Sequence, residues 1–259
     1  KLPEGIFSQT VSGEYIVNEA NVEDRDMLLV ADPTTLRPVP WSKDPAASVF
    51  LDCYRRGGKP VETSPRHVLR SVLAKYESRG WIPVVAPEVE FYLISAHTDP
   101  FKEAEPPEGR LGWTEGAKQP YSVDAMNDFD PFISQLYEYC DAQGIRIDTL
   151  SQEMGPCQFE INFLHGNAVE LADQVFLFKR TAREAAIENE MHATFLAKPM
   201  AAEAGSALHV HQSVVDKQGN NVFSRTDGKP SDLFYGFIGG LQKYMNEAML
   251  IFAPYVNSY

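Results

Sequence analysis

Two glutamates interrupt an otherwise apolar run at residues 84–94, VVAPEVEFYLI. The length of the run and its β-branched and aromatic residues predict a buried strand. Because successive side chains of a strand alternate between its two faces, Glu88 and Glu90 lie together on one face, and Val89 lies on the other with the core. Burial of an unpaired carboxylate is costly, so the glutamate face must look onto something that neutralises two negative charges.

The same pattern recurs in two later segments. In residues 158–163, QFEINF, the apolar side chains define a buried face and Glu160 lies on the opposite one, while Glu153 precedes it across a Gly-Pro bend. In residues 207–214, ALHVHQSV, the polar side chains share one face of a third predicted strand: His209, His211 and Ser213. Three strands therefore each present polar side chains from an otherwise apolar stretch.

A site rich in carboxylates, with imidazole and without thiolate, suits Mg²⁺ or Mn²⁺ better than structural zinc. Four glutamates exceed the needs of one such ion, and two or more metals on a sheet face suit phosphoryl transfer. Any single pair is equally compatible with an exposed strand face or with a salt bridge to arginine. The coincidence of three strands favours the metal site.

The sequence pattern divides the chain into two regions. Residues 1–60 carry short β-like runs between proline turns, notably 27–30 and 48–51, and residues 61–259 alternate strands with helices. Capping residues and apolar periodicity predict helices over residues 65–80, 131–144, 168–191 and 232–252. The pair Gly239-Gly240 inside the last helix predicts close backbone packing there.

Residues 97–120 form a long polar segment rich in proline and glycine. Its length suggests a functional lid or an ordered excursion, and the alternative is a tolerated surface insertion.

Composition narrows the class of protein. The 259 residues carry a formal net charge of -13, which argues against nucleic acid as a partner, and no apolar run reaches membrane-spanning length. Three scattered cysteines make neither a disulfide framework nor a paired metal motif, and the first residues do not resemble a signal peptide. We therefore expect a cytoplasmic protein with no membrane partner.

Four motifs, in this order and spacing, resemble the glutamine synthetase family: residues 87–92, 153–163, 198–200 and 205–213. The resemblance implies an α+β fold. A β-grasp-like N-terminal domain, partial here, would occupy residues 1–60. A catalytic domain with a curved antiparallel sheet and flanking helices would occupy residues 61–259, and its C-terminal part would be missing.

The resemblance also implies roles for individual residues. Ligands of a metal on the glutamate and amine side would be Glu90, Glu153 and Glu160. Ligands of a metal that handles the ATP phosphates would be Glu88 and His209. The backbone of Gly205 would contact the substrate glutamate, and the nucleotide would be contacted by Asp148, His211 and Ser213. The motifs assign no general acid or base. ATP is a co-substrate of the family's reaction, which forms γ-glutamyl phosphate and lets an amine displace phosphate.

Departures from the family pattern bear on the amine. The family's Asn that contacts glutamate is replaced by Ala204, and the loop whose aspartate holds ammonium aligns with residues 12–14, SGE. The sequences of residues 119–124 and 178–184 resemble those of the γ-glutamylpolyamine and γ-glutamylputrescine synthetase branch. This favours an organic amine, with ammonia as the alternative. A non-catalytic structural or regulatory family member is a further alternative, and a metal-dependent phosphotransferase lacks motif support.

Cys157 stands where glycine is common, which favours a small packed residue over a reactive thiol.

The family pattern extends beyond both ends of this chain. We expect an arginine-rich stretch and two further glutamates after residue 259, so the 259-residue chain alone should be catalytically incompetent. The family further implies homo-oligomeric rings, a dodecamer of stacked hexamers, with each active site at a subunit interface.

Overall fold

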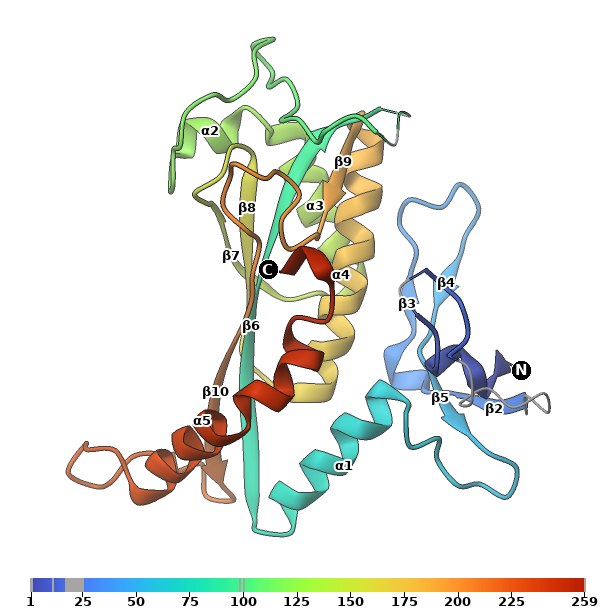
Figure 1. The fold of residues 1–259 in the computed structure, drawn as a ribbon, viewed down its shortest axis with the longest axis vertical. Coiled ribbons are helices and arrows are strands. Elements are labelled where there is room, and N and C mark those ends of the chain that lie inside the picture. Colours follow the sequence, from blue (N-terminus) through green and yellow to red (C-terminus); the bar gives the residue numbers. More distant parts are fainter. Residues whose placement is uncertain (1, 11, 17–25, 98, 100, 259) are drawn as a thin grey trace.

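A five-stranded antiparallel sheet forms the centre of the molecule (Figure 1). The computed structural model describes residues 2–10, 12–16, 26–97, 99 and 101–258. The strands of this sheet are β6 (Trp81–Ser95), β7 (Ile147–Gln152), β8 (Gln158–Phe163), β9 (Met191–Thr194) and β10 (Leu208–Asp216). Their order is β10-β6-β8-β7, and β9 pairs with residues 92–95 of β6, past the part that pairs with β10 and on the side opposite β8. The long strand β6 therefore connects both sides of the sheet, and it matches the strand predicted from residues 84–94.

Two helices, α3 (Asp130–Gln143) and α4 (Ala168–Glu188), cover one face of this sheet. Between them and the sheet lies the core, in which Phe91 stacks on or meets the rings of four other phenylalanines. The predicted stripe of α4 is in this core: Leu171, Phe178 and Ala182 are fully buried and Val175 is partly buried. The opposite face of β6 and β8 is left for the polar side chains.

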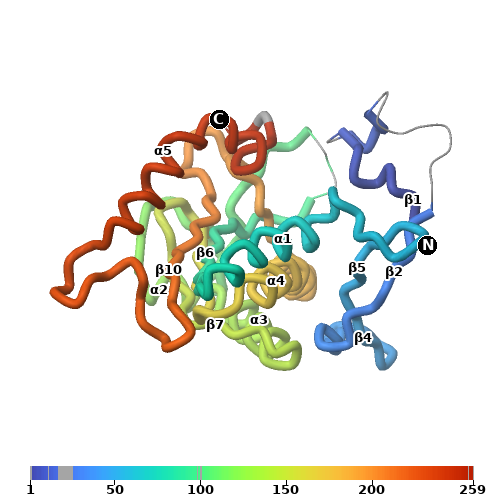
Figure 2. Tube along the Cα trace, turned by 90° about the horizontal axis from the view of Figure 1, so that it is seen from below, coloured from blue at the N-terminus to red at the C-terminus, as the bar shows by residue number. Residues whose placement is uncertain are grey.

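The N-terminal elements lie apart from this sheet, beyond helix α1 (Pro65–Glu77) (Figure 2). They are β1 (Leu2–Pro3), η1 (Glu4–Phe7), β2 (Asp26–Ala31), η2 (Pro33–Thr35), β3 (Arg37–Pro38), β4 (Ala47–Ser48) and β5 (Leu51–Tyr54). The first sheet has the order β1-β2-β5, and β3 pairs with β4. These strands fit a partial β-rich unit, and the boundary near residue 60 stays a prediction.

The predicted strand at residues 48–51 is divided between β4 and β5. The interruption falls at Phe50, whose carbonyl still accepts the amide of Asp32 at 2.9 Å, next to the β2–β5 pairing, but whose own amide donates to Thr35 Oγ1 at 2.9 Å instead of to a strand backbone. Phe50 is thereby drawn toward α1, where the guanidinium of Arg66 lies 5.6 Å from its ring centroid.

An ion-pair network joins the N-terminal elements to the helices. Arg66 of α1 donates to Asp32, Asp52 and, through two nitrogens, to Asp173 of α4, at 2.7–3.0 Å. Arg70 bonds the same two aspartates, Asp32 and Asp52. The Arg66 side chain is 14% exposed and that of Arg70 is 38% exposed, so the network is partly shielded from water, and it links the N-terminal elements to α1 and α4.

The predicted helices are present with adjusted ends. Gly144 caps α3 with a left-handed backbone, as expected, but α1 ends at Glu77 before Gly80, and α4 ends at Glu188 because Glu190 turns the chain into β9. The last elements are α5 (Asp232–Phe252) and η3 (Val256–Ser258).

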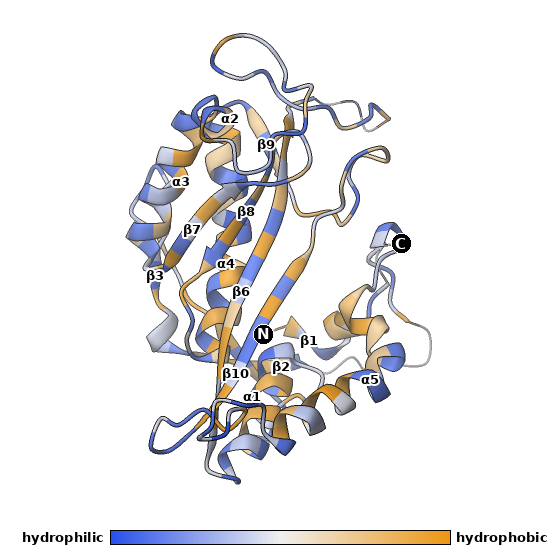
Figure 3. Cartoon of the chain, turned by 90° about the vertical axis from the view of Figure 1, so that its left-hand side faces the viewer, coloured by the Kyte–Doolittle hydropathy of each residue, from blue (hydrophilic) through white to orange (hydrophobic). Residues whose placement is uncertain are grey.

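The prediction of close packing at Gly239-Gly240 is wrong for the described chain. A methyl group on either residue would meet nothing within 4 Å, and α5 has no buried residue. Several of its apolar side chains are exposed instead, Leu250 to 83% and Ile251 to 79%. Figure 3 colours much of this helix orange, for hydrophobic residues. No helix among the described residues is long and apolar enough to cross a membrane.

The excursion at residues 97–120 leads into the short helix α2 (Val123–Asn127). Its described residues include a β-bridge between Glu108 and Thr114. Beyond that bridge, Glu115 contacts the chain on either side of the turn that links β7 to β8. The described part of the segment is thus tied to the β7–β8 turn, and its role as a functional lid, an ordered excursion or a tolerated surface insertion stays a prediction.

Candidate metal centre

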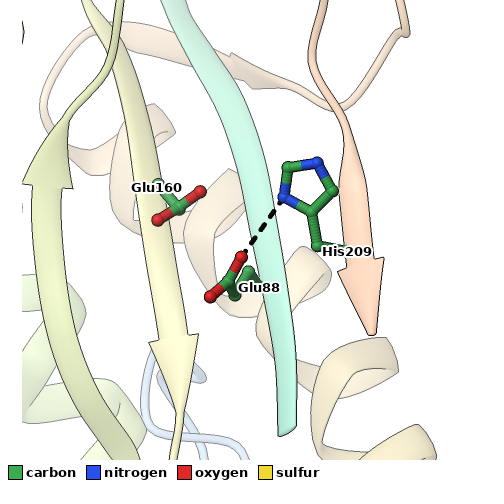
Figure 4. A group of neighbouring side chains, drawn as sticks. All are labelled: Glu88, Glu160 and His209. Carbon is green, nitrogen blue, oxygen red and sulfur yellow. Dashed lines mark ion pairs between the residues drawn. The ribbon is translucent and has the colours of Figure 1, made fainter. Parts of the chain in front are cut away.

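Three polar side chains from three neighbouring strands meet on the face of the sheet opposite the core (Figure 4). Glu88 comes from β6, Glu160 from β8 and His209 from β10, and each offers a ligand atom within 4.8 Å of the others. The register explains the meeting, since Glu88 is paired directly with His209 and Glu160 is paired with Glu90, two residues along β6. The imidazole Nδ1 of His209 lies 3.2 Å from Glu88 Oε2.

Glu90 lies on the same face, farther inside the molecule. Its side chain is 10% exposed, and its Oε2 accepts hydrogen bonds from the amide of Ala207 at 3.0 Å and from Gln158 Nε2 at 3.1 Å. Its other oxygen lies 4.0 Å from His209 Nδ1. Glu90 is therefore held in place at the inner edge of the three-residue group.

Glu153 follows the end of β7. Burial raises the pKa of this carboxyl, and the negative charges of Glu160 and Glu90 raise it further. Those causes place Glu153 in the same negative field as the other glutamates. The structure brings Glu88, Glu160 and His209 together and places Glu90 and Glu153 in their electrostatic neighbourhood, while the role of all five as metal ligands and their division between two ions stay predictions.

The predicted nucleotide contacts lie at two separate places. His211 and Ser213 are on β10, and His211 Nε2 lies 2.7 Å from Glu88 Oε1, a contact that the sequence did not indicate. Asp148 lies at a bulge of β7, at the opposite edge of the sheet from β10. Histidines therefore flank Glu88 on both carboxylate oxygens, and the role of Asp148 stays a prediction.

The loop that carries Gly205 is fixed beside Glu90. Its carbonyl accepts a hydrogen bond from Gln158 Nε2 at 3.0 Å, and a methyl group on Gly205 would stand 2.9 Å from the carbonyl oxygen of Ala197. The hydroxyl of Tyr92 donates to the carbonyl of Ala204 at 2.7 Å. Burial raises the pKa of Tyr92, and nearby carboxylates add to the effect, so this donor stays protonated.

The donor set fits a hard divalent cation. Carboxylate oxygens with one or two imidazole nitrogens are ligands that Mg²⁺ and Mn²⁺ accept. The glutamates repel one another, and the two histidines are the positively chargeable groups that the described contacts place among them. A bound divalent cation would supply the missing positive charge.

Sequence reasoning missed three residues that shape the site. Gln158 and Asn162 alternate with Glu160 along β8, and Asn162 Nδ2 donates to Glu160 Oε1 at 3.0 Å. Their period-two spacing was the signal that could have found them. Glu115 lies in an irregular excursion, where no periodicity relates it to the site.

The catalytic-domain model of glutamine synthetase matches residues 62–259, three-quarters of the chain. The chain belongs to the glutamine synthetase family. Its fold agrees with that assignment, because a solved GmaS–ADP complex superposes with a TM-score of 0.78 at 30% identity, over 92% of this chain and 54% of that one.

Relatives in the glutamine synthetase family differ in the amine that their names state. The γ-glutamylputrescine synthetase PuuA of Escherichia coli is 34% identical over 99% of this chain and 56% of its own length. A glutamate–isopropylamine ligase of a Pseudomonas species is 33% identical over 90% of this chain and 51% of its own. Proteins named glutamine synthetase match at 30–33% identity. The chain spans about half the length of the curated relatives it matches.

Proposed function

We propose that the whole protein is an ATP-dependent ligase that joins the γ-carboxyl group of glutamate to an amine. Family membership supports the proposal, and the observation that carries it is the meeting of Glu88, Glu160 and His209 on a carboxylate-lined face. Divalent cations at such a face neutralise the phosphates of ATP and the charge that develops during phosphoryl transfer.

The proposed reaction has two steps. A γ-carboxylate oxygen of glutamate attacks the γ-phosphorus of ATP, and ADP leaves. The nitrogen of the amine then attacks the acyl carbon of γ-glutamyl phosphate, phosphate leaves, and the amine loses a proton. Glu90, Glu153 and Glu160 would hold the cation on the glutamate and amine side, and Glu88 and His209 would hold the cation beside the ATP phosphates.

The substrates would be oriented by groups that the fold already fixes. The backbone of Gly205 would contact glutamate, and its position is set by Gln158 and by the tight approach to Ala197. Asp148, His211 and Ser213 would contact the nucleotide. Holding both substrates in a fixed geometry removes the entropic cost of bringing them together, which is a major source of acceleration in such reactions.

An organic amine is the proposed nitrogen donor, rather than ammonia. Ala204 removes an amide side chain from the glutamate loop, and residues 12–14 lack an aspartate that would hold ammonium. Relatives named for putrescine and isopropylamine support the same choice. Ammonia is the alternative, because glutamine synthetases match at comparable identity.

Phosphate release by the intact protein tests the activity. ATP, Mg²⁺ and glutamate are supplied with ammonium, putrescine, a longer polyamine or ethanolamine in separate reactions. We expect an organic amine to stimulate release more than ammonium does. Stimulation by ammonium alone would replace the organic amine by ammonia, and no stimulation by any amine would refute the ligase and favour a non-catalytic role.

The assembly is proposed on the same family basis. We infer homo-oligomeric rings, a dodecamer of stacked hexamers, with the sites at subunit interfaces. Sedimentation velocity on the intact protein measures the particle mass, and a monomer at micromolar concentration would contradict the proposal.

A further inference from the structure

The turn that links β7 to β8 holds an unfavourable backbone conformation beside the metal centre. Cys157 is fully buried and has a φ of +55°. This is the left-handed region, which residues other than glycine rarely adopt. The turn begins at Glu153, one of the proposed ligands, and Gln158 follows Cys157 as the first residue of β8. Something must therefore stabilise this turn for Glu153 to keep its place.

Glu115 contacts the chain on both sides of this turn. Its Oε2 accepts the amide of Cys157 at 2.6 Å, and its two oxygens accept Gln152 Nε2 at 3.1 and 3.0 Å. Gln152 precedes Glu153, and both Gln152 and Cys157 are fully buried. Hydrogen bonds to an ionised carboxylate are about twice as strong as neutral ones, so Glu115 is the strongest acceptor that these two donors contact.

The turn passes this constraint to the metal centre through Gln158. The amide of Glu153 donates to the Gln158 carbonyl at 2.8 Å, and Gln158 Oε1 accepts the amide of Gly155 at 2.9 Å. The same side chain donates through Nε2 to Glu90 Oε2 at 3.1 Å. A shift of the turn would therefore move two proposed ligands, Glu153 directly and Glu90 through Gln158.

We propose that Glu115 is a positioning residue of the metal centre. Its carboxylate stabilises the Gln152–Gln158 turn, with Cys157 in the left-handed conformation, and thereby fixes the positions of Glu153 and Glu90. The proposal rests on the proposed function for the assignment of these two glutamates as ligands. Glu115 itself contacts neither Glu153 nor Glu90 in the described hydrogen bonds, so it acts through the turn.

Direct titration of Mn²⁺ into the intact protein, followed by electron paramagnetic resonance of the free ion, tests this role without ATP, glutamate or amine. We expect Glu115→Ala to raise the dissociation constant of Mn²⁺ about tenfold, as the loss of supporting residues around metal ligands does elsewhere. Glu115→Gln keeps one acceptor for the Cys157 amide, so its effect should be smaller. Glu108→Ala, an exposed glutamate of the same excursion, is the matched control and should leave the constant within twofold of wild type.

A second substitution separates the turn from general stability. Glycine adopts the left-handed backbone freely, so Cys157→Gly should recover part of the Mn²⁺ affinity lost in Glu115→Ala. An equal loss in both backgrounds would overturn the route through the turn. If Glu115→Ala fails to fold, as judged by its thermal midpoint, Glu115→Gln provides the test.

An unchanged dissociation constant in a folded Glu115 variant would overturn the proposal. The outcome is distinguishable from a failure of the proposed function, because binding is read without turnover. A ligase that is active but binds Mn²⁺ independently of Glu115 refutes only the role of Glu115. A protein whose Mn²⁺ binding depends on Glu115 but that uses no amine refutes only the ligase.

Discussion

Gly155 occupies space that a larger residue would have to take from Tyr92. A methyl group at Gly155 would stand 1.9 Å from Tyr92 Oη and 2.6 and 2.7 Å from ring atoms Cζ and Cε1. Non-bonded carbon atoms prefer separations of about 3.5–4.0 Å, so Gly155→Ala forces the ring to move. Tyr92 is fully buried and its hydroxyl is bonded to Ala204, which leaves the ring no free space.

The expected cost follows from these contacts. Overpacking of a close-packed interior costs about 1–3 kcal/mol. Loss of the hydrogen bond from Tyr92 to Ala204 adds about 0.5–1.5 kcal/mol. Gly155→Ala should therefore lower the free energy of unfolding by about 1.5–4.5 kcal/mol, measured by urea denaturation with tryptophan fluorescence.

Two comparisons decide whether the clash with Tyr92 is the cause. Gly116→Ala adds its methyl group to open space and should change the free energy of unfolding by less than about 0.5 kcal/mol. Tyr92→Phe removes the nearest atom but leaves Cζ within 2.6 Å, so it should rescue Gly155→Ala only in part. A Gly155→Ala protein as stable as wild type, or losses that simply add in the double variant, would refute the reasoning.

Three further predictions concern charge. Arg66→Met leaves three aspartates short of a partner and should destabilise the protein by about 2–4 kcal/mol in urea, whereas the exposed Arg225→Ala should cost under about 0.5 kcal/mol; equal effects would contradict the network. Hydrogen bonds from Thr34 and then Arg66 lower the pKa of Asp32 from its usual 3.8 to about 2, so its stabilisation is complete above pH 3.8 and is lost as the pH falls through 2. Asp32→Asn should flatten that part of the stability–pH curve, and an unchanged curve would exclude this linkage. Glu90→Gln should weaken Mn²⁺ binding at least about tenfold by titration, and unchanged binding would remove Glu90 from the site.

Period-two alternation identified the polar face of the central sheet before any coordinates. It succeeded because β6 is buried on one side over its middle section, so a slip in register by one residue would place the glutamates in the core. The pairing of Glu88 with His209 and of Glu90 with Glu160 then follows from the neighbouring strands. Helix ends marked by Asn167 and Gly144 were equally readable, since each satisfies backbone groups locally.

Features that depend on contacts between distant residues could not be predicted from the sequence. The predicted strand at residues 48–51 is interrupted at Phe50, whose amide bonds the side chain of Thr35, and this contact has no local signal in the sequence. Gly239-Gly240 has the composition of a close helix contact, yet the described chain places nothing beside it. Glu115 reaches its turn from a segment without periodicity, so only the folded chain reveals what it supports.

Without a bound cation, the clustered carboxylates oppose folding. Burial and the neighbouring charges raise the pKa of Glu153, so at neutral pH the folded chain holds this carboxylate ionised at a cost that the unfolded chain does not bear. A cation that binds only the folded state returns about 2.7 kcal/mol when its concentration is a hundred times its dissociation constant. Two neutral donors, Gln158 Nε2 and the amide of Ala207, hold Glu90 in place against the repulsion of the neighbouring carboxylates. The proposed cation would therefore account for an arrangement that the stability of the fold alone does not favour.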